Sequence, residues 1–349
     1  MIYMRKHILL FMVVVTVVLA ACKSGKKDEQ QLAPFLSAKD AIQLNQLIYK
    51  DSSRNAFAKY APAYEVIFVP QPVNGNYAII AKSKAANQYA LIIRGSVIEF
   101  SNEGFQNFIL QDFNIFKIKS WNYTDSVKDA YISNGAWIGF QNLLLLRDIQ
   151  TGLTIKEFIE QKVPANASIV ITGHSLGGNL AYPLAGYLKK ELPVGKKENL
   201  QLITFGAPAA GNAAFVKDME DKFPNAERYT TDMDIASIFP DIEGIQQMSK
   251  LIGLDTILHL GALTNSVIGK ELNAGRLLDL AGEILERTNV INETNKYVQS
   301  QKHLRQLMNT YIDSATSGLS VEAIFDKAYR FHKVDRYAEL LGGGALKED

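Results

Sequence analysis

The feature that most constrains this chain is a short strand, a tight turn and a helix that follow one another directly. Residues 168–172 are mostly β-branched, as is typical of a buried parallel strand. Residues 173–177 then fit the pattern G-x-S-x-G, and the chain has a helical pattern from Asn179 onward. This order predicts a nucleophile elbow, in which Ser175 has a strained backbone conformation and an exposed Oγ.

The glycines of the pattern have a physical reason. Strand and helix pass so close to the turn that a Cβ at Gly173 or Gly177 would clash with them. We expect the N–H of Leu176, at the helix start, to face the same space as the Ser175 oxygen, where a donor and the helix dipole stabilise an oxyanion. We interpret His174 as a packing residue whose ring points elsewhere. The alternative is a glycine-rich turn with an inert serine, and the flanking strand and helix favour the elbow.

The overall charge excludes one class of partner. The chain has 349 residues, 47% of them hydrophobic, which is enough for one large α/β domain or two small ones. Lysine and arginine total 37 and aspartate and glutamate total 36, and the sequence has no basic patch interleaved with aromatic residues. We therefore expect no nucleic-acid partner.

The N-terminus has the pattern of an export signal. Arg5 and Lys6 precede an apolar run over residues 8–21, which is shorter than the ~20 residues needed to span a bilayer. Residues 19–22, Leu-Ala-Ala-Cys, resemble the lipobox of bacterial lipoproteins, whose cysteine is lipidated and becomes the mature N-terminus. Cys22 is the sole cysteine and cannot form an internal disulfide, so lipidation would account for an exported thiol. The alternative is a signal peptide with a cysteine there by chance. We predict a membrane-anchored lipoprotein of the bacterial cell envelope, in the outer membrane.

These features divide the chain into segments. Residues 1–21 are the predicted signal peptide, and residues 22–36 are a polar, charged and flexible tether. Residues 37–343 form the predicted globular domain, with a helical insertion at about 241–330. A loose tail follows at 344–349.

Strands and helices alternate along the globular domain. Strands are predicted at 64–69, 77–81, 88–93, 199–205 and 227–231, besides the strand of the elbow. Helices are predicted at 37–50, 99–116, 135–147, 154–162, 180–190 and 215–222. Asn74-Gly75, between the first two strands, is a hairpin signal. The alternation predicts an α/β fold with a mostly parallel central sheet flanked by helices.

Candidates for an acid and a base follow from their position in the chain. A serine becomes a nucleophile when a neutral imidazole takes its proton and a carboxylate orients that imidazole. In hydrolases of this topology the order along the chain is serine, acid, histidine. The remaining histidines after Ser175 are His259, His303 and His332. The acid should follow a strand, and the candidates after the strand at 227–231 are Asp232 and Asp234, with Asp241 more distant.

Four segments resemble the class 3 lipase family, which includes fungal triacylglycerol lipases and many bacterial esterases. They are Leu-Ile-Ile-Arg-Gly-Ser at 91–96, Gly-His-Ser-Leu-Gly-Gly at 173–178, Phe-Gly-Ala-Pro-Ala-Ala-Gly-Asn at 205–212 and Arg-Tyr-Thr-Thr-Asp-Met-Asp-Ile at 228–235. In order, they are similar to the family's strand ending in Arg-Gly-Ser/Thr, its elbow, its Phe-Gly-x-Pro-x-x-Gly-Asn segment and the segment bearing its acid. The resemblance implies an α/β-hydrolase fold.

The resemblance also implies a role for each matching residue. Ser175 would be the nucleophile and Asp234 the acid. The family's last motif is a histidine followed closely by a tyrosine, and Phe-His-Lys-Val-Asp-Arg-Tyr around His332 fits it best, which would make His332 the base. The family's second oxyanion donor follows Arg-Gly, which would place Ser96 beside Leu176.

Departures from the family pattern leave alternatives open. Asp234 is followed by Ile-Ala-Ser instead of the usual Val-Pro, so Asp232 stays a candidate acid, and His259 stays the alternative base. Trp137 stands where the family usually has a histidine. In the fungal relatives a lid follows the Arg-Gly-Ser segment. Residues 97–116 are therefore a lid candidate here, the alternative being a helix packed on the sheet.

The implied activity is that of a serine carboxylic-ester hydrolase, a lipase or esterase that acts on lipid or other apolar acyl esters. It requires no metal or cofactor, and no metal-ligand spacing is present in the sequence. Phospholipase A1 and thioesterase activities, and a catalytically silent envelope lipoprotein, are the alternatives. The spacing from Asp234 to His332, 332 − 234 = 98 residues, exceeds that of the compact fungal enzymes. We therefore do not infer the substrate of this chain from the substrates of those enzymes. The oligomeric state is not predicted.

We expect Cys22→Ala to release the protein from membranes, because the substituted chain cannot receive a lipid on that sulfur. Detergent phase separation measures the partition, and Ser24→Ala, two residues away in the tether, is the matched control. If the Cys22→Ala protein enters the detergent phase as fully as the control, the lipoprotein prediction is wrong.

Overall fold

The computed structural model describes residues 33–50, 53–96, 117–234, 236–241, 296–309, 329–344 and 346. All of them lie in one unit that begins at Ala33. The predicted signal peptide, Cys22, the lid candidate at 97–116 and the alternative base His259 lie outside the described residues. Among the helices that the structure describes, none has both the length and the hydrophobicity to cross a membrane.

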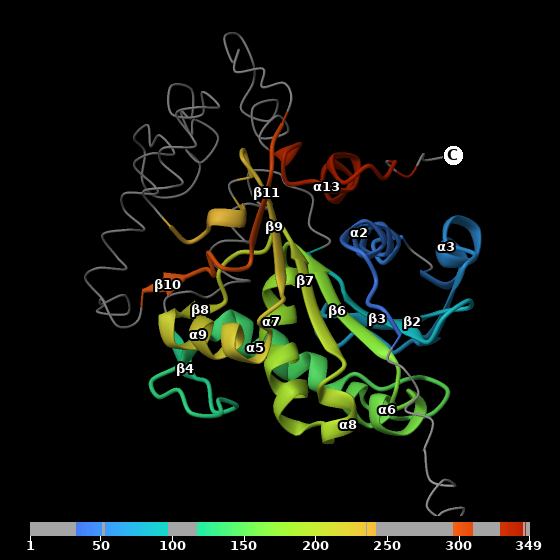
Figure 1. The fold of residues 1–349 in the computed structure, drawn as a ribbon, viewed down its shortest axis with the longest axis horizontal. Helices are drawn as coiled ribbons and strands as arrows, with labels where there is room; N and C mark the ends of the chain where they lie inside the picture. Colours follow the sequence, from blue (N-terminus) through green and yellow to red (C-terminus); the bar gives the residue numbers. More distant parts are fainter. Residues whose placement is uncertain are drawn as a thin grey trace, which may run out of the picture. The chain divides into compact units, whose positions relative to one another are not determined.

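A seven-stranded sheet lies at the centre of the described residues, in the order β1-β2-β3-β6-β7-β9-β11 (Figure 1). Its strands are β1 (Tyr64–Phe68), β2 (Ala78–Ser83), β3 (Gln88–Ile93), β6 (Ser168–His174), β7 (Leu200–Phe205), β9 (Glu227–Thr231) and β11 (Leu304–Leu307). From β3 to β11 the neighbours are parallel, and β1 and β2 add an antiparallel edge. The prediction of a mostly parallel central sheet is confirmed. Consequently the carboxyl ends of β6, β7 and β9 meet at one edge of the sheet.

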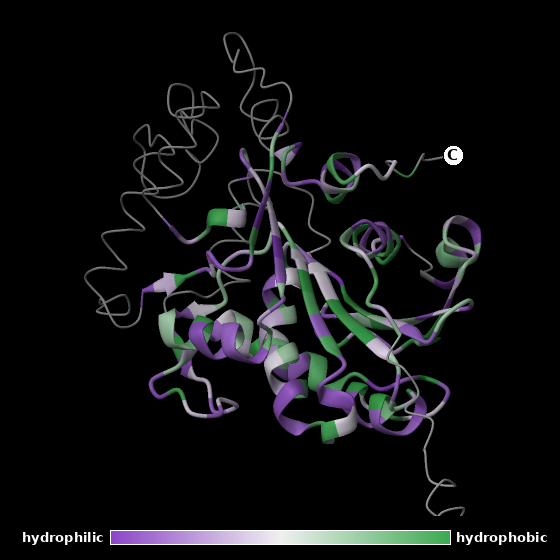
Figure 2. Ribbon diagram, in the orientation of Figure 1, coloured by the Kyte–Doolittle hydropathy of each residue, from purple (hydrophilic) through white to green (hydrophobic). Residues whose placement is uncertain are grey.

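Both faces of this sheet are covered, which explains why its strands are continuous apolar runs. All seven residues of β6 are buried. Successive side chains point to opposite faces, so Ile169 and Ile171 pack in one hydrophobic cluster and Val170 packs in the other. Figure 2 shows hydrophobic colouring along the central strands.

Helices supply the cover on each face. The face of Ile169 packs against α5 (Asn134–Leu145), α6 (Ile155–Lys162), α7 (Leu176–Glu191) and α9 (Ala213–Lys222). The face of Val170 packs against α2 (Ala38–Leu47), α3 (Ser53–Tyr60) and α13 (Val334–Leu340). The short α8 (Val194–Lys197) and the 3₁₀ helix η2 (Ala236–Ile238) complete the described helical elements. Ser37 caps α2, and Thr154 with Glu157 forms a capping box at the start of α6.

The predicted hairpin is confirmed. Asn74 and Gly75 have φ values of 47° and 79°, the left-handed region that a tight hairpin turn requires. β1 and β2 pair antiparallel on either side of this connection, with Tyr64 opposite Ser83.

The segment at about 241–330 was predicted to be mostly helical, and the part of it that the structure describes contains two strands. β10 (Tyr297–Val298) and β11 lie there, and β11 pairs with β9, with Leu304 beside Arg228 and Leu307 beside Thr231. Leu304 and Leu307 are three residues apart, a spacing that also fits one turn of a helix. The sequence pattern of a four-residue segment therefore does not distinguish a strand from a helix. A second, four-stranded sheet was not predicted either; it contains β10, β8 (Gly211–Asn212), β5 (Tyr131–Ser133) and β4 (Ile118–Ser120).

Candidate active site

The elbow lies between β6 and α7, at the edge of the sheet where the parallel strands end. Ser175 has φ 58° and ψ −129°, a conformation that costs a non-glycine residue about 1–3 kcal/mol, so the predicted backbone strain is confirmed. A Cβ at Gly173 would lie 2.3 Å from the backbone of Gly177, and a Cβ at Gly177 would lie 2.2 Å from the carbonyl oxygen of Ile93. Both glycines are therefore required by the close crossing of strand and helix.

A serine, a histidine and an aspartate from three separate segments meet at this turn. Oγ of Ser175 lies 2.7 Å from Nε2 of His332, and Nδ1 of His332 lies 3.0 and 2.9 Å from the two carboxylate oxygens of Asp234. A carboxylate accepts hydrogen bonds, so the ring hydrogen is on Nδ1 and the lone pair of Nε2 faces the serine hydroxyl. This is the arrangement in which an imidazole takes a proton from serine.

The three side chains are more enclosed than expected. Ser175 is 5% exposed, His332 4% and Asp234 1%. Ser175 is less exposed than the elbow pattern predicts, because the ring of His332 lies against its oxygen and the chain after β3 packs on the elbow. A Cβ at Gly95 would lie 3.3 Å from Cβ of Ser175.

Asp234 and Asp232 have different partners, although both follow β9. Oδ1 of Asp234 accepts from the N–H of Ala236 at 2.9 Å, in addition to its contact with the His332 ring. Asp232 instead accepts from the backbone N–H of Asn309 at 3.0 Å and from the same residue's side-chain amide. The structure therefore brings Asp234, and not Asp232, to the imidazole.

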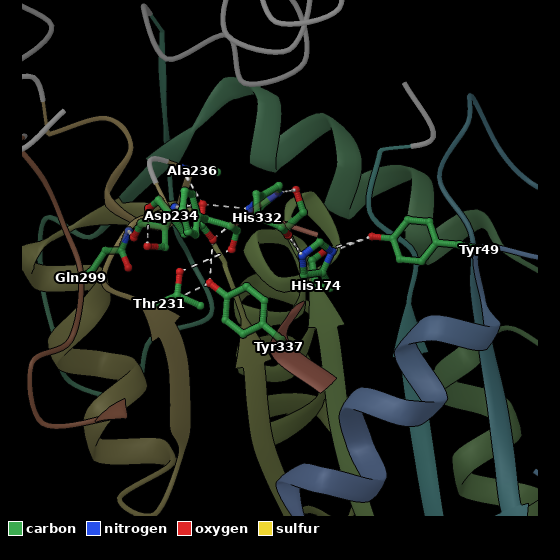
Figure 3. A network of polar contacts seen from close by, with 11 residues as sticks. Tyr49, His174, Thr231, Asp234, Ala236, Gln299, His332 and Tyr337 are labelled. Atoms are coloured by element: carbon green, nitrogen blue, oxygen red, sulfur yellow. Dashed lines mark hydrogen bonds and ion pairs between the residues drawn. The ribbon is translucent and has the colours of Figure 1, made fainter. Parts of the chain in front are cut away.

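Tyr337, on α13, is a second side chain that contacts the carboxylate of Asp234, besides His332 (Figure 3). Its hydroxyl donates to Oδ2 of Asp234 at 2.6 Å and accepts from the N–H of Thr231 at 3.2 Å. Burial, together with the neighbouring carboxylate, raises the pKa of Tyr337, so the hydroxyl stays protonated and remains a donor. The sequence contained a signal for this residue in the close spacing of His332 and Tyr337.

A second polar connection supports the loop of the acid. The side-chain amide of Gln299 donates to the carbonyl oxygen of Ser237 at 2.7 Å, and the Ser237 hydroxyl donates to the carbonyl oxygen of Asp234 at 2.7 Å (Figure 3). Arg228 in turn donates to the side-chain oxygen of Gln299. No local pattern in the sequence indicated Gln299, because it comes from a segment about 60 residues further along the chain.

Both residues predicted as oxyanion donors lie at the elbow. Leu176 is the first residue of α7. Ser96 follows the stretch that packs on Gly177, since a Cβ at Gly177 would lie 2.9 Å from the nitrogen of Gly95. The hydroxyl oxygen of Ser96 is buried and has no hydrogen-bond partner among the described residues. A buried hydroxyl of this kind needs a partner, and a polarised carbonyl oxygen of a substrate could supply one.

Comparison with known protein families finds a match over part of the chain. Residues 97–243 match the model of the family Lipase (class 3), so the predicted resemblance to class 3 lipases is confirmed. The matched span contains Ser175 and Asp234 and ends before His332. In the fold, His332 nevertheless lies next to Ser175. The chain is a serine ester hydrolase.

The hydrolase also resembles solved structures of lipases. The crystal structure of M37 lipase is 22% identical, with 88% of this chain and 93% of that chain covered and a TM-score of 0.63. Lipase II from Rhizopus niveus is 19% identical, with 61% of this chain and 78% of that chain covered and a TM-score of 0.46. The likeness to M37 lipase confirms the predicted α/β-hydrolase fold.

The two other histidines among the described residues of the hydrolase have different surroundings. His303 is buried next to β11, where its carbonyl oxygen accepts from the N–H of Arg228 at 2.8 Å. His174 is buried too, and its ring contacts the backbone of His332 instead of the Ser175 oxygen. Within the described residues no cluster of three or more His, Cys, Asp or Glu side chains could hold a metal ion.

Gly206 provides the space for the acid and the imidazole, which gives a test of the site. It has φ 56°, and a Cβ there would lie 2.8 Å from Oδ2 of Asp234 and 3.2 Å from Nδ1 of His332. We predict that Gly206→Ala lowers kcat roughly 10²-fold, because a displacement of about 1 Å at a catalytic group costs that much. Gly195→Ala, which would meet no atom within 4 Å, is the matched control. Equal esterase rates for the two variants would contradict the prediction.

Proposed function

We propose that this hydrolase cleaves the acyl esters of lipids or other apolar alcohols through an acyl-enzyme, with Ser175 as nucleophile, His332 as base and Asp234 as acid. The observation that supports it most directly is the 2.7 Å approach of Nε2 of His332 to Oγ of Ser175. The match to the family Lipase (class 3) supports the apolar ester class.

The first half of the reaction follows from this geometry. Oγ of Ser175 forms a bond to the ester carbonyl carbon while its proton passes to Nε2 of His332. Asp234 keeps the hydrogen on Nδ1 and stabilises the positive ring that results. When the tetrahedral intermediate breaks its bond to the alcohol oxygen, His332 gives the proton to the leaving alcohol, and the acyl group stays on Ser175.

Water completes the cycle through the same groups. His332 takes a proton from a water molecule, which attacks the acyl carbon, and then returns it to Oγ of Ser175 as the carboxylic acid leaves. In both halves the backbone N–H of Leu176 and Ser96 would bind the oxyanion, and one such donor typically contributes about 3 kcal/mol of transition-state stabilisation.

Location at a membrane is the second part of the proposal. The Leu-Ala-Ala-Cys sequence at 19–22, after an apolar run with two preceding cations, supports a lipid anchor on Cys22. We propose an envelope lipoprotein of the outer membrane, whose tether would place the hydrolase next to insoluble esters. A water-insoluble substrate would then be present at high local concentration.

Covalent labelling tests the proposal that Ser175 is an activated nucleophile. We predict that a fluorophosphonate probe labels the protein and that Ser175→Ala abolishes the label, because the probe reacts with an activated serine. Ser83→Ala, at a buried serine of β2, is the matched control and should keep the label. Absence of label on the wild-type protein would support a silent envelope component. Hydrolysis of p-nitrophenyl esters of rising chain length, phospholipids and triglycerides then identifies the ester class.

A pair of matched substitutions tests the acid. Asp234→Asn should lower kcat by about 10⁴-fold, because an amide next to Nδ1 favours the wrong ring tautomer. Asp232→Asn should change kcat only a few-fold, because Asp232 contacts Asn309 and not the imidazole. The assignment is wrong if Asp232→Asn gives the larger loss on the same p-nitrophenyl ester.

A further inference from the structure

The histidine that precedes the nucleophile lies directly against the catalytic histidine. His174 is the last residue of β6 and is 4% exposed. Its ring centroid is 4.8 Å from that of His332, and its Nε2 lies 2.6 Å from the backbone carbonyl oxygen of His332. The mechanism above uses neither the ring of His174 nor this contact.

The contact determines which nitrogen of His174 bears hydrogen. A carbonyl oxygen can only accept, so Nε2 must donate and bears the hydrogen. Burial, with a smaller contribution from the neighbouring His332, lowers the pKa of His174 well below its usual range, so the ring is neutral. Nδ1 therefore has a free lone pair and needs a donor.

Tyr49 is that donor (Figure 3). Its hydroxyl lies 3.1 Å from Nδ1 of His174, and 3.4 Å from the carbonyl oxygen of the same residue. Burial raises the pKa of Tyr49, so the phenol keeps its hydrogen. The oxygen of that hydroxyl accepts from the backbone N–H of Gly95 at 3.2 Å.

Every hydrogen bond in this series has a fixed direction. The Gly95 N–H donates to Tyr49, the Tyr49 hydroxyl donates to Nδ1 of His174, and Nε2 of His174 donates to the backbone of His332. The series joins the chain after α2, the chain after β3, the end of β6 and the loop before α13. Gly95 directly precedes Ser96, so the series connects the two sides of the reaction centre.

The position of Gly95 shows how closely these groups are packed. A Cβ there would lie 2.2 Å from the Tyr49 hydroxyl and 2.6 Å from the carbonyl oxygen of His174. A residue with a side chain would push the tyrosine hydroxyl off the ring nitrogen. Glycine at position 95 therefore leaves the space that the hydrogen bonds of this series require.

We propose that His174 and Tyr49 are positioning residues, which fix the backbone of His332 relative to the strand end that holds Gly95 and Ser96. The proposal rests on the ester hydrolysis proposed above. Asp234 and Tyr337 orient the ring of His332 through its Nδ1 side, whereas His174 holds its carbonyl group. The imidazole is thus held at both the side chain and the main chain, and the second attachment sets how far Nε2 lies from Ser175 and from the oxyanion donors.

Two substitutions at His174 separate positioning from packing. In His174→Gln the side-chain amide nitrogen reaches about as far as Nε2 and can still donate to the His332 carbonyl oxygen. In His174→Asn the shorter amide can reach the Tyr49 side but not that oxygen. On a p-nitrophenyl ester that the wild-type protein cleaves, we expect the asparagine variant to lose about 10²-fold in kcat with KM little changed. The glutamine variant should keep kcat to within a few-fold of the wild-type value.

Tyr49→Phe tests the same series without changing the histidine. Loss of the hydroxyl leaves Nδ1 of His174 and the N–H of Gly95 without this partner, so we expect roughly a tenfold loss in kcat, again with KM little changed. Tyr89→Phe, at a buried tyrosine on β3 at the opposite end of the strand from Gly95, is the matched control and should keep the wild-type rate. The melting temperature of each variant shows whether it is folded.

The outcomes distinguish this proposal from the proposed function. If the wild-type protein neither cleaves an ester nor takes a fluorophosphonate label on Ser175, the proposed function fails and the positioning roles fail with it. If the wild-type protein is active but the glutamine and asparagine variants lose the same rate, or lose none, His174 is a packing residue and the proposal is overturned. If the asparagine variant does not fold, the proposal is judged on Tyr49→Phe against Tyr89→Phe, where equal rates overturn it.

Discussion

The chemistry of this chain depends on one contact, the 2.7 Å approach of Nε2 of His332 to Oγ of Ser175. The serine is at the carboxyl end of β6, the acid follows β9, and the histidine precedes α13. These segments meet because β6, β7 and β9 are parallel neighbours, so the chain leaves all of them at the same edge of the sheet. The packing on both faces of the sheet and the glycines at the elbow hold this edge together. They thereby help to fix the distance between Nε2 of His332 and Oγ of Ser175.

Hydrogen bonds from neutral groups hold the site in place. The carboxylate of Asp234 accepts from a tyrosine hydroxyl, a ring N–H and backbone N–H groups, all inside the protein. Since Asp234 is 1% exposed, the loss of one of these donors would weaken the stabilisation of a buried carboxylate. Donors of this kind have fixed directions, whereas an ion pair attracts over a range of geometries. A site that needs one imidazole tautomer at one position is better served by directed contacts.

The sequence predicted what is local and missed what is not. The elbow, the hairpin at Asn74-Gly75 and the parallel strands follow from spacing and residue type over a few positions. His332 was reached through chain order and the family resemblance, although the structure is what places it at Ser175. Tyr49 and Gln299 had no local signal, because their partners lie 125 and 62 residues away in the chain. β11 was missed because a four-residue strand at the edge of the sheet has too short a pattern to separate it from helix.

The long spacing between acid and base is compatible with a precise site because the described chain returns to the sheet before it reaches His332. β11 pairs parallel with β9, so Leu307 lies beside Thr231 and the chain leaves β11 at the edge where Asp234 lies. Directly afterwards, the amide of Asn309 donates to Asp232 while its oxygen accepts from Nε of Arg336 at 2.8 Å. The loop of the acid and the helix after the base are thereby tied to the same residue. The entropic cost of closing a loop rises only with the logarithm of its length. Added residues between Asp234 and His332 therefore destabilise the site little once these attachments exist. The distance along the chain therefore does not set the distance between the catalytic groups, because the chain is attached at β9–β11 and at Asn309 before it reaches His332.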